Sequence, residues 1–292
     1  MKIYDAIMGL VVGDALGVPY EFRQRNTFKA EDMTGYGTHS QPPGTWSDDS
    51  SMTLATLSSL ACYGKIKPDD IMLRFSKWLH DAEYTARDEV FDIGLTTHSA
   101  ILRYLRGTPL HKCGSNSEYS NGNGALMRIL PLAFLPHTLD DLYDVAGLTH
   151  AHEISQTACE IYTNVAMRIL GGLKKGRAVY LETSDLPHPF ERLEYLGNLT
   201  RDEIKSSGYV VDTLEAALWC LLKTDSYRDC VLTAVNLGDD TDTVAAVAGG
   251  LAGIYYGVGG EKGIPEEWIA HVAKHDEIKK LCEAFERRAE NG

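Results

Sequence analysis

A helical spacing of apolar side chains runs through nearly all of this 292-residue chain. Ile3, Ile7, Leu10 and Val11, for example, fall on one face of a helix that ends near Gly17. Strand-like alternation of apolar and polar residues is nearly absent, so the sequence predicts an all-α fold. The predicted helices lie at 3–16, 48–63, 71–81, 97–105, 125–134, 139–148, 154–173, 211–222, 227–235, 243–256 and 266–288.

The segment 243–256 differs from the other predicted helices because small residues fill it. Its alanines and glycines let neighbouring backbones approach closely, so we expect this helix at the centre of the fold. The last predicted helix, 266–288, has separate apolar and charged faces and is expected on the surface. Loops rich in glycine, asparagine or proline are expected at 34–44, 112–124 and 185–189. No repeat and no long linker divides the chain, which predicts a single domain over residues 1–292.

The charge balance argues against a nucleic-acid duplex as a partner. The chain carries 28 Lys and Arg against 41 Asp and Glu, a net charge of −13. Binding to a phosphate backbone depends on Lys and Arg displacing counterions, and the sequence has no basic stripe that would do so. We expect a monomer with an acidic surface.

Membrane and disulfide signals are equally weak. No run approaches the roughly 20 apolar residues that cross a bilayer, and the N-terminal apolar run at 6–12 stops at Gly13 and Asp14. The 6 cysteines lie far apart, and no pair has the spacing of zinc ligands. We therefore expect a cytoplasmic protein with buried thiols and no membrane partner.

Two short acidic segments carry most of the functional information. Ser47-Asp48-Asp49 and the Asp-Asp-Thr-Asp-Thr run at 239–243 each stand at the start of a predicted helix. Neither Lys nor Arg occurs at 30–64 or at 229–261. The acids therefore lack cationic partners nearby in the sequence.

Two interpretations fit these acids. An Asp in the first turn of a helix complements the helix dipole, which contributes about 0.3–1 kcal/mol, and Ser47 is a suitable N-cap. Capping alone does not readily explain why two acids are adjacent and why no cation follows four residues later. Carboxylate and hydroxyl oxygens also bind Mg²⁺, Mn²⁺ or Ca²⁺, so the two helix starts could instead meet around one or two divalent cations.

Three other features are weak when taken singly. The Ser-Asn-Gly-Asn-Gly loop at 120–124 precedes a predicted helix, where backbone amides can hold a phosphate, although a plain turn and helix cap also explains it. Glu21 follows Pro19 on a loop, where an acid is usually just solvated. Asp92 suits a cap for the helix that follows it.

These pieces, in this order, resemble the ADP-ribosylglycohydrolase family. The resemblance runs from Gly9 to about Gly257, and its specificity comes from six segments in register, since any one alone is weak. The segments are Gly13-Asp14-Ala15-Leu16-Gly17 with Glu21, Trp46-Ser47-Asp48-Asp49, Phe91-Asp92-Ile93-Gly94 with Thr96 and Thr97, Asn121-Gly122-Asn123-Gly124 with Met127 and Arg128, Thr149-His150, and Gly238 to Thr243.

The resemblance implies an all-α orthogonal multi-helix bundle with a central site for two Mg²⁺ or Mn²⁺ ions. Two positions depart from the family pattern. Ser47 replaces a frequent threonine and keeps the hydroxyl, whereas Asp239 replaces a usual glycine and leaves open a ligand register that includes it. The metal ligands that the resemblance implies are Ser47, Asp48, Asp49, Asp240, Asp242 and Thr243.

The resemblance also implies the reaction, which is hydrolysis of the glycosidic bond between ADP-ribose and a modified acceptor, either a protein side chain or a small molecule. Glu21, Asp92 or the metal-bound Asp49 would act as acid or base, and the choice among them stays open. The implied substrate-binding residues are Ser120, Asn121 and Gly122 at the diphosphate, His150 at the ADP-ribose, Tyr209 along the cleft, and Asn123.

A competing hypothesis comes from a different class of protein. The chain could be a catalytically silent ADP-ribose binder, or an immunity-type protein that blocks a partner with its surface. Such a silenced relative would be expected to have lost some of the metal ligands or Glu21, and this sequence has kept them.

Overall fold

The helical spacing of the sequence produces an all-α bundle, which confirms the predicted fold class. The computed structural model describes residues 2–290 and contains no strand in that range. The short 3₁₀-helices used below are η1 (Val18–Tyr20), η2 (Gly37–His39), η5 (Leu126–Arg128), η6 (Leu130–Phe134) and η7 (Glu191–Asn198). The α-helices are α1 (Lys2–Gly17), α2 (Asp48–Tyr63), α3 (Pro68–Asp81), α4 (Leu95–Leu105), α5 (Leu139–Gly147), α6 (Glu153–Leu170), α7 (Lys175–Thr183), α8 (Val210–Lys223), α9 (Tyr227–Val235), α10 (Thr241–Tyr256), α11 (Glu266–His271) and α12 (His275–Glu290).

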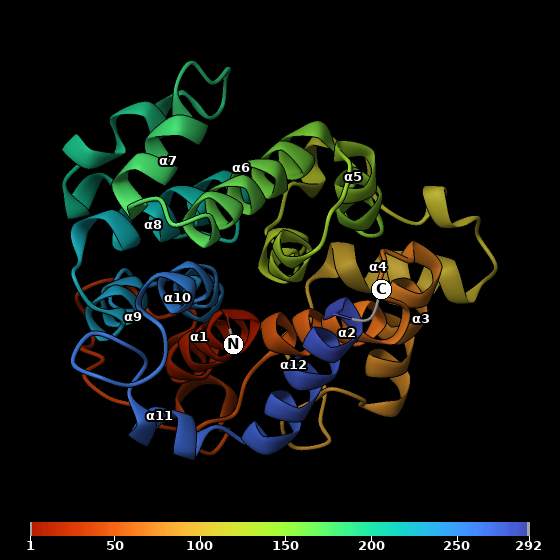
Figure 1. Ribbon diagram of the computed structural model, residues 1–292, viewed down its shortest axis with the longest axis horizontal. Helices are drawn as coiled ribbons and strands as arrows, with labels where there is room; N and C mark the ends of the chain where they lie inside the picture. The colour runs from red at the N-terminus through yellow and green to blue at the C-terminus, as the bar shows by residue number, and fades with distance from the viewer. Residues whose placement is uncertain (1, 291–292) are drawn as a thin grey trace.

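Helices α1 and α10 lie side by side (Figure 1) in the interior of the protein. Their backbones approach so closely that a Cβ atom at Gly13 of α1 would overlap the carbonyl oxygen of Ala245 on α10. Gly9 and Gly249 face one another in the same way one turn further along. Both helices are almost wholly buried, which confirms the prediction of a central small-residue helix.

The N-terminal ends of α2 and α10 meet beside α1. Helix α2 contacts both α1 and α10, and α12 packs along α2. Helices α6, α8 and α9 pack against α10 from its other sides. The buried apolar side chains of these helices form one continuous core. This packing places the starts of two helices, and hence both acidic segments, in the interior.

Two of the predicted helices are partly wrong. The segment 125–134 forms the two 3₁₀-helices η5 and η6, because Pro131 near the start of η6 lacks an N–H and its ring clashes with an α-helical turn. The segment 266–288 forms α11 and α12, because Val272 is extended and the N–H of Ala273 donates to the carbonyl of Gly44 at 2.9 Å. Helices α7 and η7 have no counterpart among the predicted helices.

Helix α1, together with η1, is long and apolar enough to cross a membrane by length and composition alone. Its most apolar window is 83% buried inside the protein. Such burial is typical of a core helix, since a membrane span would expose its apolar side chains to lipid.

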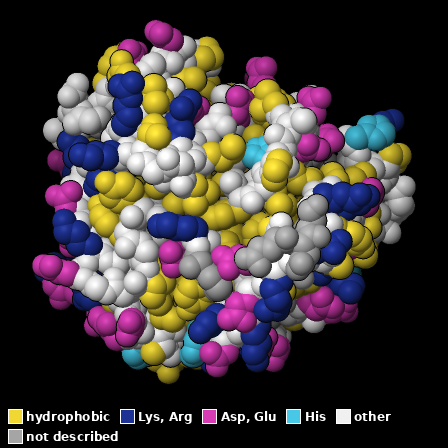
Figure 2. Space-filling view, viewed as in Figure 1, with side chains coloured by type: hydrophobic (Ala, Val, Ile, Leu, Met, Phe, Trp, Pro, Cys, Tyr) yellow, Lys and Arg dark blue, Asp and Glu magenta, His cyan; other side chains and the backbone are white. Residues whose placement is uncertain are grey.

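Charged side chains of both signs share the surface. On the face shown in Figure 2, Lys and Arg lie interspersed with Asp and Glu, and hydrophobic side chains form an irregular band between them. No basic stripe crosses this face, as the sequence predicts.

Candidate functional site

Asp14 on α1 caps the start of α2. Its carboxylate accepts hydrogen bonds from the backbone N–H of Ser47 at 2.9 Å, from that of Ser50 at 3.0 Å and from the Ser50 hydroxyl at 2.5 Å. Burial nevertheless raises the pKa of Asp14 to about 6. Ser47 completes the cap by accepting the N–H of Asp49 at 3.3 Å, which confirms its predicted role. Asp14 is a site residue that the sequence reasoning missed; the available signal was an acid in the otherwise apolar run at 6–17.

The packing of α1 on α10 brings the second acidic segment to the same place. The Thr241 hydroxyl donates to the carbonyl of Gly17 at 2.8 Å and ties the first turn of α10 to the end of α1. One carboxylate oxygen from each of Asp14, Asp49 and Asp242 then lies within 4.8 Å of the other two. The two acidic segments therefore converge in space, although they are far apart in the sequence.

These carboxylates are crowded, buried and incompletely paired. Asp49 Oδ1 and Asp242 Oδ2 are buried and have no hydrogen-bond partner among the described residues. Burial, reinforced by neighbouring negative charges, raises the pKa of Asp48, Asp49 and Asp242 well above the usual range. An ionised carboxylate is costly to bury without a compensating charge. The cluster therefore fits divalent cations, which bind through oxygen ligands.

The hydroxyl groups and the remaining acid lie at the same centre. The hydroxyls of Ser47 and Thr243 donate to Asp49 Oδ2 at 3.0 and 3.3 Å. Asp240 accepts a hydrogen bond from Asn123 Nδ2 at 2.8 Å, and burial raises its pKa. The structure thus brings the six predicted ligands together around the starts of α2 and α10.

Asp239 lies outside this group. Its side chain is exposed, and its backbone N–H and C=O pair with Arg23 and Phe22 at 2.9 and 2.7 Å. The residue adopts a positive φ of 60°. The geometry therefore favours the ligand register that uses Asp240 and Asp242.

A cavity of about 420 Å³ opens beside the acidic cluster. Asp48, Asp240 and Thr243 line part of its wall, whereas Asp49 and Asp242 are buried behind them. A concave site of this size with convergent polar groups suits a small-molecule ligand. The other lining residues are Glu21, Phe22, Asp92, Ile93, Gly94, Leu95, Thr96, Thr97, Gly122, Asn123, Gly124, Met127, His150 and Gly208.

Glu21, His39 and Asp92 form a second titratable group beside the cavity, with one ligand atom from each lying within 4.8 Å of the other two. Glu21 is buried and forms an ion pair with His39, and this hydrogen bond raises the pKa of the imidazole. Burial, followed by the charge of Glu21, raises the pKa of Asp92 to about 8. His39, in η2, was missed because the sequence predicts a loop at 34–44, where no spacing marks it as a partner for an acid.

The cavity wall contains part of the predicted substrate-binding set. Gly122, Asn123 and His150 line it. Asn121 does not, because its buried side chain accepts from Ser155 Oγ at 2.9 Å and lies 3.1 Å from His152 Nδ1, which ties the loop to α6.

Ser120 and Tyr209 are also outside the set that lines the cavity. The Ser120 hydroxyl is bonded to that of Ser115 at 2.9 Å, and Tyr209 pairs with Gly122 through its backbone. Contacts of Ser120, Asn121 and Tyr209 with a substrate stay predictions.

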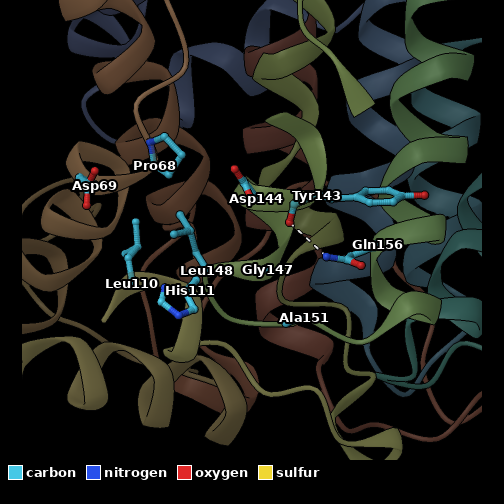
Figure 3. A pocket seen from close by; sticks show the side chains of 10 residues that line it. All are labelled: Pro68, Asp69, Leu110, His111, Tyr143, Asp144, Gly147, Leu148, Ala151 and Gln156. Atoms are coloured by element: carbon cyan, nitrogen blue, oxygen red, sulfur yellow. Dashed lines mark hydrogen bonds between the residues drawn. The ribbon is translucent and has the colours of Figure 1, made fainter. Parts of the chain in front are cut away.

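A second cavity, of about 430 Å³, flanks the segment 147–151 that carries His150 (Figure 3). The ring of Tyr143 points away from this cavity, while its backbone carbonyl accepts from Gln156 at 3.3 Å. The two carboxylates among its lining residues, Asp69 and Asp144, are exposed. The crowded, buried acids therefore single out the first cavity as the candidate active site.

Comparisons with known proteins find similar sequences and a similar fold. The sequence model of the ADP-ribosylglycohydrolase family matches residues 1–292. ADP-ribosylarginine hydrolase Tri1 of Serratia proteamaculans is 33% identical over 291 residues, covering 97% of this chain and 78% of that protein. ADP-ribosyl-[dinitrogen reductase] glycohydrolase of Rhodospirillum rubrum is 34% identical over 285 residues, covering 92% and 89%. A solved structure titled "ADP-ribosylglycohydrolase-related protein complex" superposes with a TM-score of 0.83 at 32% identity, covering 99% of this chain and 98% of the other.

Proposed function

The chain belongs to the ADP-ribosylglycohydrolase family, and from this premise we propose that it hydrolyses the glycosidic bond between ADP-ribose and an arginine side chain. The observation that carries the proposal is the cavity itself. Its wall brings metal-type oxygen ligands, represented by Asp48 and Asp240, together with the carboxyl groups of Glu21 and Asp92. This combination suits hydrolysis at an anomeric carbon, because charge develops on the sugar while protons move to and from the water and the leaving group.

Metal dependence is supported by the orphaned oxygens of the cluster. Asp49 Oδ1 and Asp242 Oδ2 have no hydrogen-bond partner within residues 2–290 and are free to bind a cation. Two Mg²⁺ or Mn²⁺ ions held there would compensate the buried charge and polarise oxygens of the ribose or of water. The residues proposed to hold them are Ser47, Asp48, Asp49, Asp240, Asp242 and Thr243.

Glu21 and Asp92 divide the proton transfers, because their environments differ. Asp92 has a raised pKa of about 8, so it holds a proton at neutral pH that it can give to the departing nitrogen. Glu21, paired with His39, is the carboxylate that accepts a proton from the attacking water. The water oxygen forms a bond to the anomeric carbon as the carbon–nitrogen bond breaks, and one proton passes from water to Glu21 while another passes from Asp92 to the leaving group.

The oxygen acceptors and the exposed ring at the cavity mouth suit an arginine acceptor. Glu21, Asp48 and Asp92 line this wall with carboxyl oxygens, which accept hydrogen bonds from a guanidinium. Phe22 lines the same cavity and is 69% exposed, so its ring is available to a planar guanidinium. The Serratia relative is named for the same linkage.

Another part of the cavity lining suits the diphosphate of the nucleotide. The start of α4, from Leu95 to Thr97, lines the cavity there, and the free amides of a helix N-terminus bind anions. Gly122 and His150 complete this wall. The ADP-ribose would thus lie between a donor-rich wall and the acidic cluster.

The proposal is tested with purified protein and proteins ADP-ribosylated at arginine, serine or glutamate, with Mg²⁺ or Mn²⁺ present or removed by a chelator. We expect metal-dependent release of ADP-ribose from the arginine linkage. Release from serine alone would refute the arginine assignment. Absence of release from every linkage, with metal binding demonstrated by calorimetry, would refute hydrolysis.

A pair of variants separates chemistry from folding. Glu21→Gln removes the proposed base and should lower kcat by roughly 100-fold or more, with little change in metal binding. Asp239→Asn removes an exposed acid of the same acidic run and should leave kcat within about twofold of the parent, since surface changes have small effects. Equal losses in both variants would contradict the role of Glu21.

A further inference from the structure

A buried arginine stands behind the histidine of the cavity wall. Arg128, at the end of η5, is fully buried. Its guanidinium donates to the carbonyl oxygens of Val145 and Ala146, in the last turn of α5, at 3.1 and 3.4 Å. It also lies 4.8 Å from the centre of the Phe75 ring. Burial lowers the pKa of Arg128 to about 10, so the group stays charged at neutral pH.

Arg128 also donates to Thr149, and this bond determines what the threonine hydroxyl can do. Arg128 Nη2 lies 2.9 Å from Thr149 Oγ1, and a guanidinium can only donate. Thr149 Oγ1 lies 2.8 Å from His150 Nδ1, the one acceptor that the described residues offer to the hydroxyl proton. The hydroxyl therefore accepts from Arg128 and donates to His150 Nδ1.

The proton of a neutral His150 then belongs on Nε2. His150 is 2% exposed, and its ring packs on the 122–124 turn, where a Cβ atom at Gly124 would lie 2.8 Å from His150 Cε1. A Cβ atom at Gly122 would lie 3.6 Å from Nε2. The two glycines thus leave the Nε2 edge open on the side where His150 lines the cavity, and Nε2 has no hydrogen-bond partner within the described part of the chain.

We propose that Arg128 and Thr149 are positioning residues, which fix His150 as a neutral imidazole whose single proton is on Nε2 and points into the cavity as a hydrogen-bond donor to an oxygen of the nucleotide. The identity of that nucleotide rests on the proposed function, whereas the tautomer is a property of the free protein. The opposite tautomer would turn the Nε2 lone pair toward the cavity, where it would repel a diphosphate oxygen, which can only accept a hydrogen bond.

The electrostatics agree with this geometry. Burial, and then the charge of Arg128, lower the pKa of His150 to about 3. Because no imidazolium forms near neutral pH, His150 offers the ligand an oriented hydrogen-bond donor and no positive charge. Arg128, which has no carboxylate partner among residues 2–290, acts through Thr149 and does not itself reach the cavity lining.

The first test is the tautomer of the wild-type protein. Nitrogen-15 spectra of its histidine side chains, with the His150 signals identified by their loss in His150→Gln, should show an unprotonated Nδ1 and a protonated Nε2 from about pH 5 to about pH 8. A protonated Nδ1, or an imidazolium near pH 6, would overturn the proposal. This readout is made on the wild-type protein and needs no turnover.

The second test is a matched set of threonine variants. Thr149→Val keeps the shape and removes the hydroxyl, so His150 should populate both tautomers and ADP-ribose should bind roughly 2- to 10-fold more weakly, the range for one lost hydrogen bond. Thr149→Ser should restore both properties. Thr163→Val is the control, because the Thr163 hydroxyl is buried without a hydrogen-bond partner in the described residues and the same substitution there should change neither.

The outcomes separate this inference from the proposed function. If arginine-linked ADP-ribose is not released while His150 shows the Nε2–H form, the proposed activity fails and the positioning role stands. If release occurs while the His150 proton is on Nδ1, the positioning role fails. An unchanged tautomer and an unchanged ADP-ribose affinity in Thr149→Val would also overturn it.

Discussion

Removing divalent cations should make the folded protein less stable as the pH rises. Burial raises the pKa of Asp14 from 3.8 to about 6 and that of Asp92 to about 8. A carboxyl group whose pKa is higher in the folded than in the unfolded chain binds more protons when folded. Its stabilising contribution is complete below about pH 4 and is lost as the pH rises through the folded-state pKa. The decline should therefore extend from about pH 4 to about pH 8.

The size of the effect can be worked out from Asp14 alone. A shift from 3.8 to about 6 corresponds to about 3 kcal/mol, at about 1.4 kcal/mol per unit. For a domain of this size, 1 kcal/mol changes Tm by roughly 2 °C, so Tm should fall by about 6 °C or more. Asp48, Asp49 and Asp242 shift in the same direction and add to the decline.

The assay is thermal unfolding at a series of pH values, with chelator or with saturating Mn²⁺. Cations bind the ionised carboxylates and compete with protons, so the metal-loaded protein should lose the decline. A cation present at a hundred times its Kd stabilises the fold by about 2.7 kcal/mol. The difference in Tm between the Mn²⁺-loaded and the metal-free protein should therefore increase as the pH rises.

Two variants make the reasoning refutable. Asp49→Asn removes one crowded charge, so it should raise the metal-free Tm at pH 8 and abolish the metal-dependent shift. Asp239→Asn changes the net charge by the same amount at an exposed position, so it should leave Tm unchanged at every pH, with or without Mn²⁺. A metal-free Tm that is flat or rising over the range, or an Asp49→Asn variant that is simply less stable, would refute the argument that buried repulsion dominates this site.

Two further predictions concern packing. Gly13→Ala would force α1 away from the Ala245 carbonyl. It should lower the free energy of unfolding, measured in urea, by about 1–3 kcal/mol, and it should reduce the increase in Tm that Mn²⁺ produces. An unchanged increase in Tm would show that the spacing of α1 and α10 does not control the site. Arg192→Ala removes both 2.9 Å hydrogen bonds to the buried Glu215 carboxylate. The unpaired charge should lower the free energy of unfolding by about 1–3 kcal/mol. The double variant Arg192→Ala, Glu215→Gln should lose less stability, because it buries no charge.

The parts of the fold that the sequence predicts well are those with local chemical signals. Ser47 and Gly64 bound α2 as expected, because an N-cap hydroxyl and a left-handed C-terminal glycine act within one turn of the helix. The lack of cations around the two acidic segments left capping and convergence both open, and it was the family resemblance that favoured convergence. The predicted helix at 125–134 is interrupted at Pro131. The proline could have been used to predict this break, but the helical spacing of the apolar residues was given more weight.

The residues that the sequence does not reveal are those whose partners lie far away in the chain. Asp14 resembles an isolated polar residue in an apolar helix until the start of α2 is placed over it, 33 residues later. His39 becomes chemically meaningful only when its loop folds back on Glu21. Arg128 and Thr149 form their bond across 21 positions, and the family pattern marks both without saying what they do.

The small residues of α1 and α10 then explain why the acidic site exists at all. Helices that pack through ordinary side chains lie about 8–10 Å apart, whereas a Cβ atom at Gly17 would already overlap the backbone of Asp242. This contact is what brings oxygens of Asp14 and Asp242 within 4.8 Å of one another. The same closeness excludes the water that would otherwise screen them, so the fold itself creates the repulsion that a cation relieves. Metal binding and the packing of these two helices are therefore one coupled equilibrium, and a substitution that loosens either should loosen the other.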